Sequence, residues 1–258
     1  MRTRQPRLAP RQRAVVAPVL LCVALLTLWL VLAARLPDFL VPEPSAVVHK
    51  LVSGFTTGTT LTFLWPTLVE AGLGCLVGAG VALPLAIILR WPWADAATRP
   101  FLGATQAIPA VALAPLLVLW VGYGLWSIVL LCSLIVFFPI LVASSSGLRH
   151  VDRAVVDASR IDGAGSWQRL VHIELPLALP WLFAGLRNGF TLSVTGAVVG
   201  EMVMGGRGLG MVLTSQRDRV DTAGMVATII LLASVASAAY LALMALERRS
   251  AIVRSLTD

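Results

Sequence analysis

The residues on which an enzymatic site would be built are the histidines, the lysine and the glycine-rich runs of this chain. A P-loop requires lysine directly after glycine, whereas the only lysine, Lys50, follows His49. None of the 3 histidines pairs with another at the i, i+4 spacing of a zinc-binding helix. The run from Gly205 to Gly210 lacks the G-x-G-x-x-G order of a dinucleotide site and is predicted to form a turn. We therefore expect no catalytic, cofactor or metal site in this chain, and no ATP hydrolysis by it.

A polar stretch at 149–180 has a spacing that suits docking rather than catalysis. Asp152 is placed to cap a first short helix, because a carboxylate can accept hydrogen bonds from the free N–H groups of the first turn. Gly163 can adopt the left-handed geometry that ends such a helix. Ser166 is predicted to cap a second helix, which we expect Pro176 to close. Two short helices at an angle would form a knuckle; the alternative is an amphipathic helix that rests on lipid headgroups.

The elements that must position this stretch are long apolar runs. Charged residues make up 13% of the 258 residues and the mean hydropathy is +0.87, whereas a soluble domain carries about a quarter charged residues. A run of about 20 apolar residues is long enough to cross the hydrocarbon core as a helix. Gly74 and Gly78 have the G-x-x-x-G spacing that allows close helix packing. We expect an all-α polytopic membrane protein with about six transmembrane helices, near residues 14–34, 68–89, 101–121, 125–144, 181–202 and 223–246.

The net charge of +7 is distributed as in a membrane protein rather than as in a nucleic-acid-binding surface. Arginines concentrate before the first expected span, in alternate loops and after the last one, as the positive-inside rule predicts. This distribution predicts that both termini and the polar stretch face the cytoplasm. We accordingly divide the chain into a basic cytoplasmic N-terminus at 1–13, a transmembrane domain at 14–250 and a cytoplasmic tail at 251–258.

The polar stretch contains a spaced motif, Asp157-Ala158-Ser159-x3-Gly163-x9-Ile173-x-Leu175-Pro176. It resembles the EAA loop of ABC-importer permeases, E-A-A-x3-G-x9-I-x-L-P. Aspartate replaces the usual glutamate at 157 and serine replaces the second alanine at 159, and these changes keep the charge and the small size. Shorter strings across residues 40–250 resemble the nitrate, sulfonate and taurine branch of these permeases, among them Gln106-Ala107-Ile108-Pro109, Gly196-Ala197-Val198-Val199-Gly200-Glu201 and Arg207-Gly208-Leu209-Gly210.

The resemblance implies that the loop is a coupling helix, which docks in a groove of a cytoplasmic ABC ATPase subunit. That subunit, and not this chain, would bind ATP and magnesium. A second permease copy, most simply in a homodimer, an extracytoplasmic solute-binding protein and a place in the bacterial inner membrane are implied as well. The residues that the resemblance assigns to ATPase coupling are Asp157, Ala158, Ser159, Arg160, Gly163, Ala164, Ile173, Leu175 and Pro176.

Three polar residues in or near the spans, Gln106, Arg187 and Glu201, are candidates for the translocation pathway. Each has a structural alternative. Gln106 could bond a neighbouring helix, Arg187 could snorkel to the interface, and Glu201 could hydrogen-bond the turn at 205–210. Arg187 and Glu201 cannot pair with each other, because they are ~21 Å apart along one helix.

The function that these features predict is that of the permease subunit of an ATP-driven importer. The solute is expected to be small and organic or anionic, such as a sulfonate, taurine, nitrate or a thiamine precursor. The alternative is a self-contained secondary transporter or channel, against which the scarcity of charges at mid-span argues.

Overall fold

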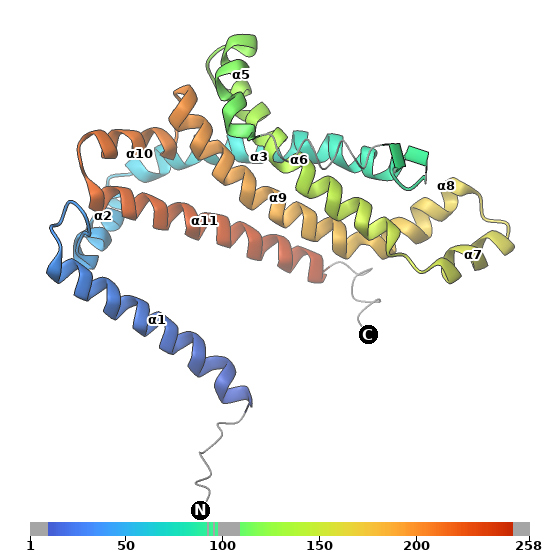
Figure 1. Cartoon of the computed structure of the whole chain (residues 1–258), viewed down its shortest axis with the longest axis horizontal. Coiled ribbons are helices and arrows are strands. Elements are labelled where there is room, and N and C mark those ends of the chain that lie inside the picture. Colours follow the sequence, from blue (N-terminus) through green and yellow to red (C-terminus); the bar gives the residue numbers. More distant parts are fainter. Residues whose placement is uncertain (1–9, 92, 95, 98–108, 250–258) are drawn as a thin grey trace, which may run out of the picture.

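The computed structural model describes residues 10–91, 93–94, 96–97 and 109–249, and every regular element among them is a helix (Figure 1). In chain order, the helices are α1 Pro10–Arg35, α2 Pro44–Thr56, α3 Thr59–Ile88, η1 Ala110–Leu113, α5 Ala114–Val121, α6 Leu125–Arg149, α7 Arg153–Ile161, α8 Ser166–Arg169, the π-helical turn η2 Leu170–Glu174, α9 Leu175–Met204, α10 Leu209–Asp218 and α11 Thr222–Arg249.

The long helices confirm that the chain is an all-α polytopic membrane protein. The third expected span, 101–121, is described only from residue 109 onward, where a shorter apolar segment covers Ala110–Val121. The segments that are long and apolar enough to cross a membrane within the described residues number five: Pro18–Arg35, Thr59–Ile88, Leu125–Arg149, Ser166–Met204 and Thr222–Arg249.

Helices α3, α6 and α9 pack against one another and supply most of the core. The predicted G-x-x-x-G contact is confirmed on α3. A Cβ atom at Gly78 would lie 2.9 Å from the backbone oxygen of Ser133, and one at Gly74 would lie 3.2 Å from that of Val129. Because α6 offers its backbone here, only glycine lets the two helices come this close.

Different short helices lie at the two ends of the bundle. Helices α7 and α8 lie at one end of the long helices, and the last turn of α11 lies at that same end (Figure 1). Helices α2 and α10 lie at the opposite end (Figure 1). Helix α1 stands apart from the three-helix core, to which it leads through α2.

Candidate functional site

The first half of the polar loop has the geometry that its sequence predicts. Asp152 caps α7, because its Oδ1 accepts a hydrogen bond of 2.8 Å from the Ala154 N–H. The helix ends before Gly163, which adopts a φ of 82°. The Ala164 N–H then donates to the Ser159 carbonyl oxygen at 3.0 Å. A cap at one end and a left-handed glycine at the other thus define a short helix with a sharp turn.

The second half of the loop corrects two predictions. Ser166 does not cap the second helix; it is the first residue of α8, and Gly165 occupies the N-cap position, where its N–H donates to the Gln168 side chain at 2.9 Å. Pro176 does not close the second helix; α8 passes through the π-helical turn η2 into α9, and Pro176 lies in the first turn of α9. Proline is tolerated in a first helical turn, where its missing N–H costs least. The wider turn at Leu170–Glu174 comes immediately before it and relieves the tight α-helical spacing that a proline ring opposes. The loop therefore joins α9 without a break.

The tip of the loop is exposed, but the nine coupling residues do not all lie on it. The exposed ones are Asp157, Ala158, Arg160 and Gly163. Asp157 and Arg160 form an ion pair of 2.8 Å whose side chains are 62% and 58% exposed. Ser159 is buried instead, and its hydroxyl donates to the Val156 carbonyl oxygen at 2.7 Å. Ala164, Ile173, Leu175 and Pro176 are half-buried where the loop leads back to the bundle.

Two apolar side chains at the tip were missed by reasoning from the motif. Ile161, the last residue of α7, is 88% exposed, and Trp167 in α8 is 73% exposed. The signal for them was present, since both interrupt an otherwise polar stretch. Large exposed apolar side chains beside a small-residue turn are typical of a surface that a partner covers.

Arg90, beyond the end of α3, fastens this loop to the bundle. Its Nη1 donates to a Glu174 carboxylate oxygen at 3.1 Å, and its Nη2 donates to the Ser166 hydroxyl at 2.6 Å. The side chains of Arg90 and Glu174 are only 14% and 13% exposed. The sequence indicated no partner for Arg90, because 84 residues separate it from Glu174.

Of the pathway candidates, Arg187 is neutralised within the chain and Gln106 lies outside the described residues. The guanidinium of Arg187 forms an ion pair with Glu247 of α11. It also lies 5.4 Å from the centre of the Tyr240 ring, within the range of a cation–π contact. These contacts join α9 to α11, and a role for Arg187 in the pathway stays a prediction.

Glu201 accepts a hydrogen bond from the turn at 205–210, which is the structural alternative predicted for it. It is 1% exposed, and its two carboxylate oxygens accept from the Gly210 N–H and from the Thr67 hydroxyl, the latter at 2.7 Å. The Thr67 hydroxyl oxygen in turn accepts from the Leu209 N–H at 2.9 Å. Glu70, which is 4% exposed, interacts with Glu201 from α3 and was not recognised as a candidate. A pathway role for Glu201 stays a prediction.

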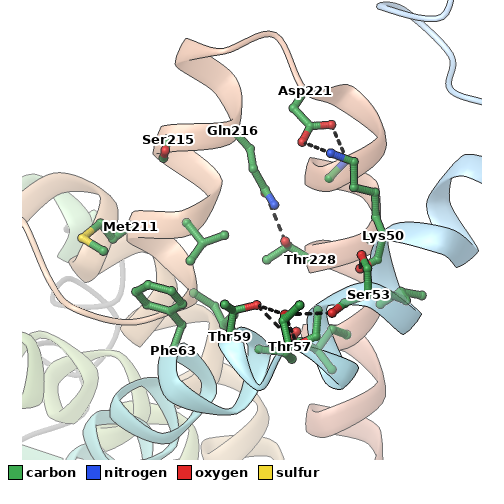
Figure 2. A pocket seen from close by; sticks show the side chains of 18 of the residues that line it. Lys50, Ser53, Thr57, Thr59, Phe63, Met211, Ser215, Gln216, Asp221 and Thr228 are labelled. Atoms are coloured by element: carbon green, nitrogen blue, oxygen red, sulfur yellow. Dashed lines mark hydrogen bonds and ion pairs between the residues drawn. The ribbon is translucent and has the colours of Figure 1, made fainter.

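A cavity of about 540 Å³ lies next to this turn, between α2, α3, α10 and α11 (Figure 2). Lys50 donates to Asp221 at 2.7 Å, and Thr228 donates to Gln216 at 3.1 Å. Burial alone would raise the pKa of Asp221, but the hydrogen bonds from Lys50 and the Gly224 N–H outweigh it and lower the pKa. The stabilisation from this carboxylate is therefore present at neutral pH and is lost only as the pH falls through the lowered pKa.

The family model for the inner membrane component of binding-protein-dependent transport systems matches residues 74–252. The chain belongs to this family. The permease is 38% identical over 214 residues to the riboflavin transport system permease protein RibX of Chloroflexus aurantiacus, covering 82% of this chain and 80% of that one. It is 31% identical over 232 residues to the formylaminopyrimidine transport permease protein ThiX of Halalkalibacterium halodurans, covering 89% and 92%.

Two further likenesses extend over most of the permease. It is 29% identical over 248 residues to the taurine transport system permease protein TauC of Escherichia coli, covering 93% of this chain and 90% of that one. Its fold matches a chain of the MetNI methionine ABC transporter in an inward-facing conformation, with a TM-score of 0.65 and 19% identity over 75% of this chain and 96% of that one. The protein is thus a multi-pass inner-membrane permease subunit of an ABC importer, and ATPase activity lies on a separate subunit.

Proposed function

We propose that the loop at 149–180 couples closure of a cytoplasmic ABC ATPase to alternating access in this permease. The observation that carries the proposal is the geometry of the loop tip. A capped helix and a left-handed glycine hold the tip in one shape, and Ile161 and Trp167 leave its apolar surface uncovered. The half-buried ion pair of Arg90 and Glu174 ties that loop to the spans. An ATPase subunit that binds such an exposed loop, fixed in shape and joined to the spans, could displace the transmembrane helices when it closes.

The proposal includes the partners that coupling requires. ATP and magnesium would be bound by the ATPase, two copies of this chain would enclose the solute path, and an extracytoplasmic binding protein would deliver the solute. The loop and both termini would face the cytoplasm. The arrangement in Figure 1 supports this orientation in part, since the last turn of α11 lies at the same end as α7. A cysteine introduced by Ala164→Cys should react with an impermeant maleimide from the cytoplasmic side alone.

For the solute, we propose a small organic or anionic molecule. The relatives named above carry riboflavin, formylaminopyrimidine and taurine in their names, and these share a modest size and several hydrogen-bonding groups. An uptake assay that compares these three compounds, with the matching binding protein supplied, tests the class directly.

Charge reversal at the loop tip tests the coupling role. We expect Asp157→Arg to reduce the affinity for the ATPase roughly ten-fold or more, because a reversed charge in a docking surface costs about 1.4 kcal/mol or more. Gly163→Pro should have a similar effect, since proline cannot adopt a φ of 82°. The measurement is the amount of ATPase that co-purifies with each variant.

Asp218→Arg is the matched control for Asp157→Arg. Asp218 is also 62% exposed and also pairs with an arginine, Arg217, but it lies on α10 at the other end of the bundle. Co-purification should be unchanged in this control. Equal amounts of ATPase with Asp157→Arg, Gly163→Pro and the parent chain would contradict the coupling role of the loop.

A further inference from the structure

Helix α3 is joined to other elements by polar contacts at Arg90, just beyond its last residue, and at Thr67, in its N-terminal half. At the loop end, Arg90 holds Glu174 and Ser166 by the two hydrogen bonds described above. This ion pair differs from the exposed pair of Asp157 and Arg160, because both of its side chains are largely excluded from water. Because little water reaches this pair, separating its charges is costlier than at an exposed pair, so the contact favours one relative position of the two elements.

In its N-terminal half, α3 is joined to the start of α10 through Thr67. The Thr67 hydroxyl donates to Glu201 and accepts from the Leu209 N–H, the first residue of α10. From Thr67 to Arg90 the chain advances ~35 Å at 1.5 Å per helical residue, which is about the thickness of the membrane core. One helix thus spans the distance from the coupling loop to the α10 turn.

Between these two contacts, α3 packs closely against α6. Its glycines lie against the α6 backbone, as shown by Gly74 and Gly78. Pro66 and Pro84 interrupt the helical hydrogen bonding, but Thr67 beside the first and Ala82 and Ala86 around the second are buried. Close packing at these positions restricts bending of the helix at the two prolines.

Helix α10 forms a wall of the cavity in Figure 2. Met211, Ser215 and Gln216 project from it, and Thr59 and Phe63 come from the start of α3. The facing wall is made by α2 and the first turns of α11, which the ion pair of Lys50 and Asp221 joins. Movement of α3 and α10 relative to that wall would change the width of the cavity.

We propose that Arg90 is a positioning residue that transmits displacement of the coupling loop through α3 to α10, so that the cavity changes with the state of the ATPase. This inference rests on the proposed coupling function. The loop is continuous along the chain with α6 and α9 but not with α3, which Arg90 joins to it by the two hydrogen bonds. Transmission requires that the two states differ in their contacts, and displacement of the loop would change the geometry of the half-buried pair of Arg90 and Glu174.

The test uses the complete transporter, purified with its ATPase subunits and reconstituted in liposomes. Cys22 is exposed and is removed by Cys22→Ala, whereas Cys75 and Cys132 are buried and are kept. Ser215→Cys places a reporter on the cavity wall. The rate at which a membrane-impermeant maleimide modifies this reporter is measured with and without Mg-ATP and vanadate.

In the parent transporter we expect nucleotide and vanadate to change the labelling rate roughly ten-fold, within the usual range of coupling between distant sites. Arg90→Gln and Glu174→Gln should each reduce this change to less than about two-fold, and the swap Arg90→Glu with Glu174→Arg should recover it. Arg217→Gln, which removes an arginine from an exposed pair, should behave like the parent. The ATPase should co-purify equally with all of these variants.

Two results would overturn the inference. In one, the labelling rate of the parent transporter does not change with Mg-ATP and vanadate; in the other, it changes in Arg90→Gln as much as in the parent. A folding defect is recognised from the elution profile, and recovery in the charge swap separates it from loss of transmission. Failure of the ATPase to co-purify with the parent chain is a different result, because it contradicts the coupling function itself.

Discussion

Gly78→Leu is expected to prevent stable assembly of the helical bundle. At this position α3 meets α6 so closely that an added Cβ would lie 2.9 Å from the Ser133 carbonyl oxygen and closer still to the Val136 side chain. A backbone atom cannot rotate away, so the helices must separate along their whole contact. Overpacking of a core typically costs 1–3 kcal/mol, and a leucine at a backbone contact should cost about 3 kcal/mol or more. The measurement is the thermal midpoint of the monodisperse peak in detergent.

Gly80→Leu is the matched control on the same helix. Gly80 is exposed, and nothing lies within 4 Å of the place that its Cβ would take. Leucine is a better helix former than glycine by up to about 1 kcal/mol, so the control should be as stable as the parent chain or slightly more so. Equal losses in Gly78→Leu and Gly80→Leu would show that α3 and α6 do not meet through Gly78.

The spans and their closest contact could be predicted because each depends on a few neighbouring residues. Whether an apolar run is long enough to cross the bilayer can be read from the sequence alone, without knowing which helices it packs against. The spacing of Gly74 and Gly78 likewise places both on one face of α3 without any knowledge of the partner. For the same reason the cap at Asp152 and the left-handed turn at Gly163 could be predicted, since both bond within their own segment.

The continuation of the second loop helix through Pro176 could not be predicted in this way. The rule that proline ends a helix assumes regular α-helical geometry before it. The π-helical turn from Leu170 to Glu174 breaks that assumption, and five residues of altered geometry leave no periodic signal. The sequence therefore predicted that the second loop helix ends at Pro176, whereas it continues through the π-helical turn into α9.

Side-chain partners that are far apart along the chain could not be predicted from residue spacing either. Arg187 was predicted as a candidate for the translocation pathway, and its pairing with Glu247, which lies 60 positions away, could not be foreseen. The same holds for Arg90 and Glu174, and for Glu70 beside Glu201. Each of these contacts depends on how α3, α9 and α11 pack. Because these spans are apolar on all sides, their sequences do not show which face of each helix meets its neighbour. The identity of a polar residue in a span was thus predictable, but its partner was not.

Glu201→Ala is expected to destabilise the permease by about 3 kcal/mol or more and to abolish most uptake. The variant leaves the Gly210 N–H without its acceptor and creates a cavity in the core, and the Thr67 hydroxyl keeps only its 3.3 Å bond to the Phe63 carbonyl oxygen. Each unpaired buried group costs about 1–3 kcal/mol, and the cavity adds to this. The start of α10 would then lose the bond from the Gly210 N–H and keep the one from the Leu209 N–H to Thr67. Thermal midpoints and uptake rates, measured on the same preparations, test the result, with the exposed Asp218→Asn as the control.

Glu201→Gln separates the structural role of this residue from a role in the pathway. Glutamine keeps the shape but offers one acceptor oxygen instead of two, so it cannot accept from both Thr67 and Gly210 through separate oxygens as the carboxylate does. A structural role predicts an intermediate loss of stability, about 1–2 kcal/mol, with uptake falling in proportion. It also predicts that Thr67→Val and Glu201→Ala are non-additive, because both remove the same bond. If Glu201→Gln instead loses uptake at unchanged stability, and Thr67→Val adds independently, the carboxylate acts on the solute path and not on the turn that precedes α10.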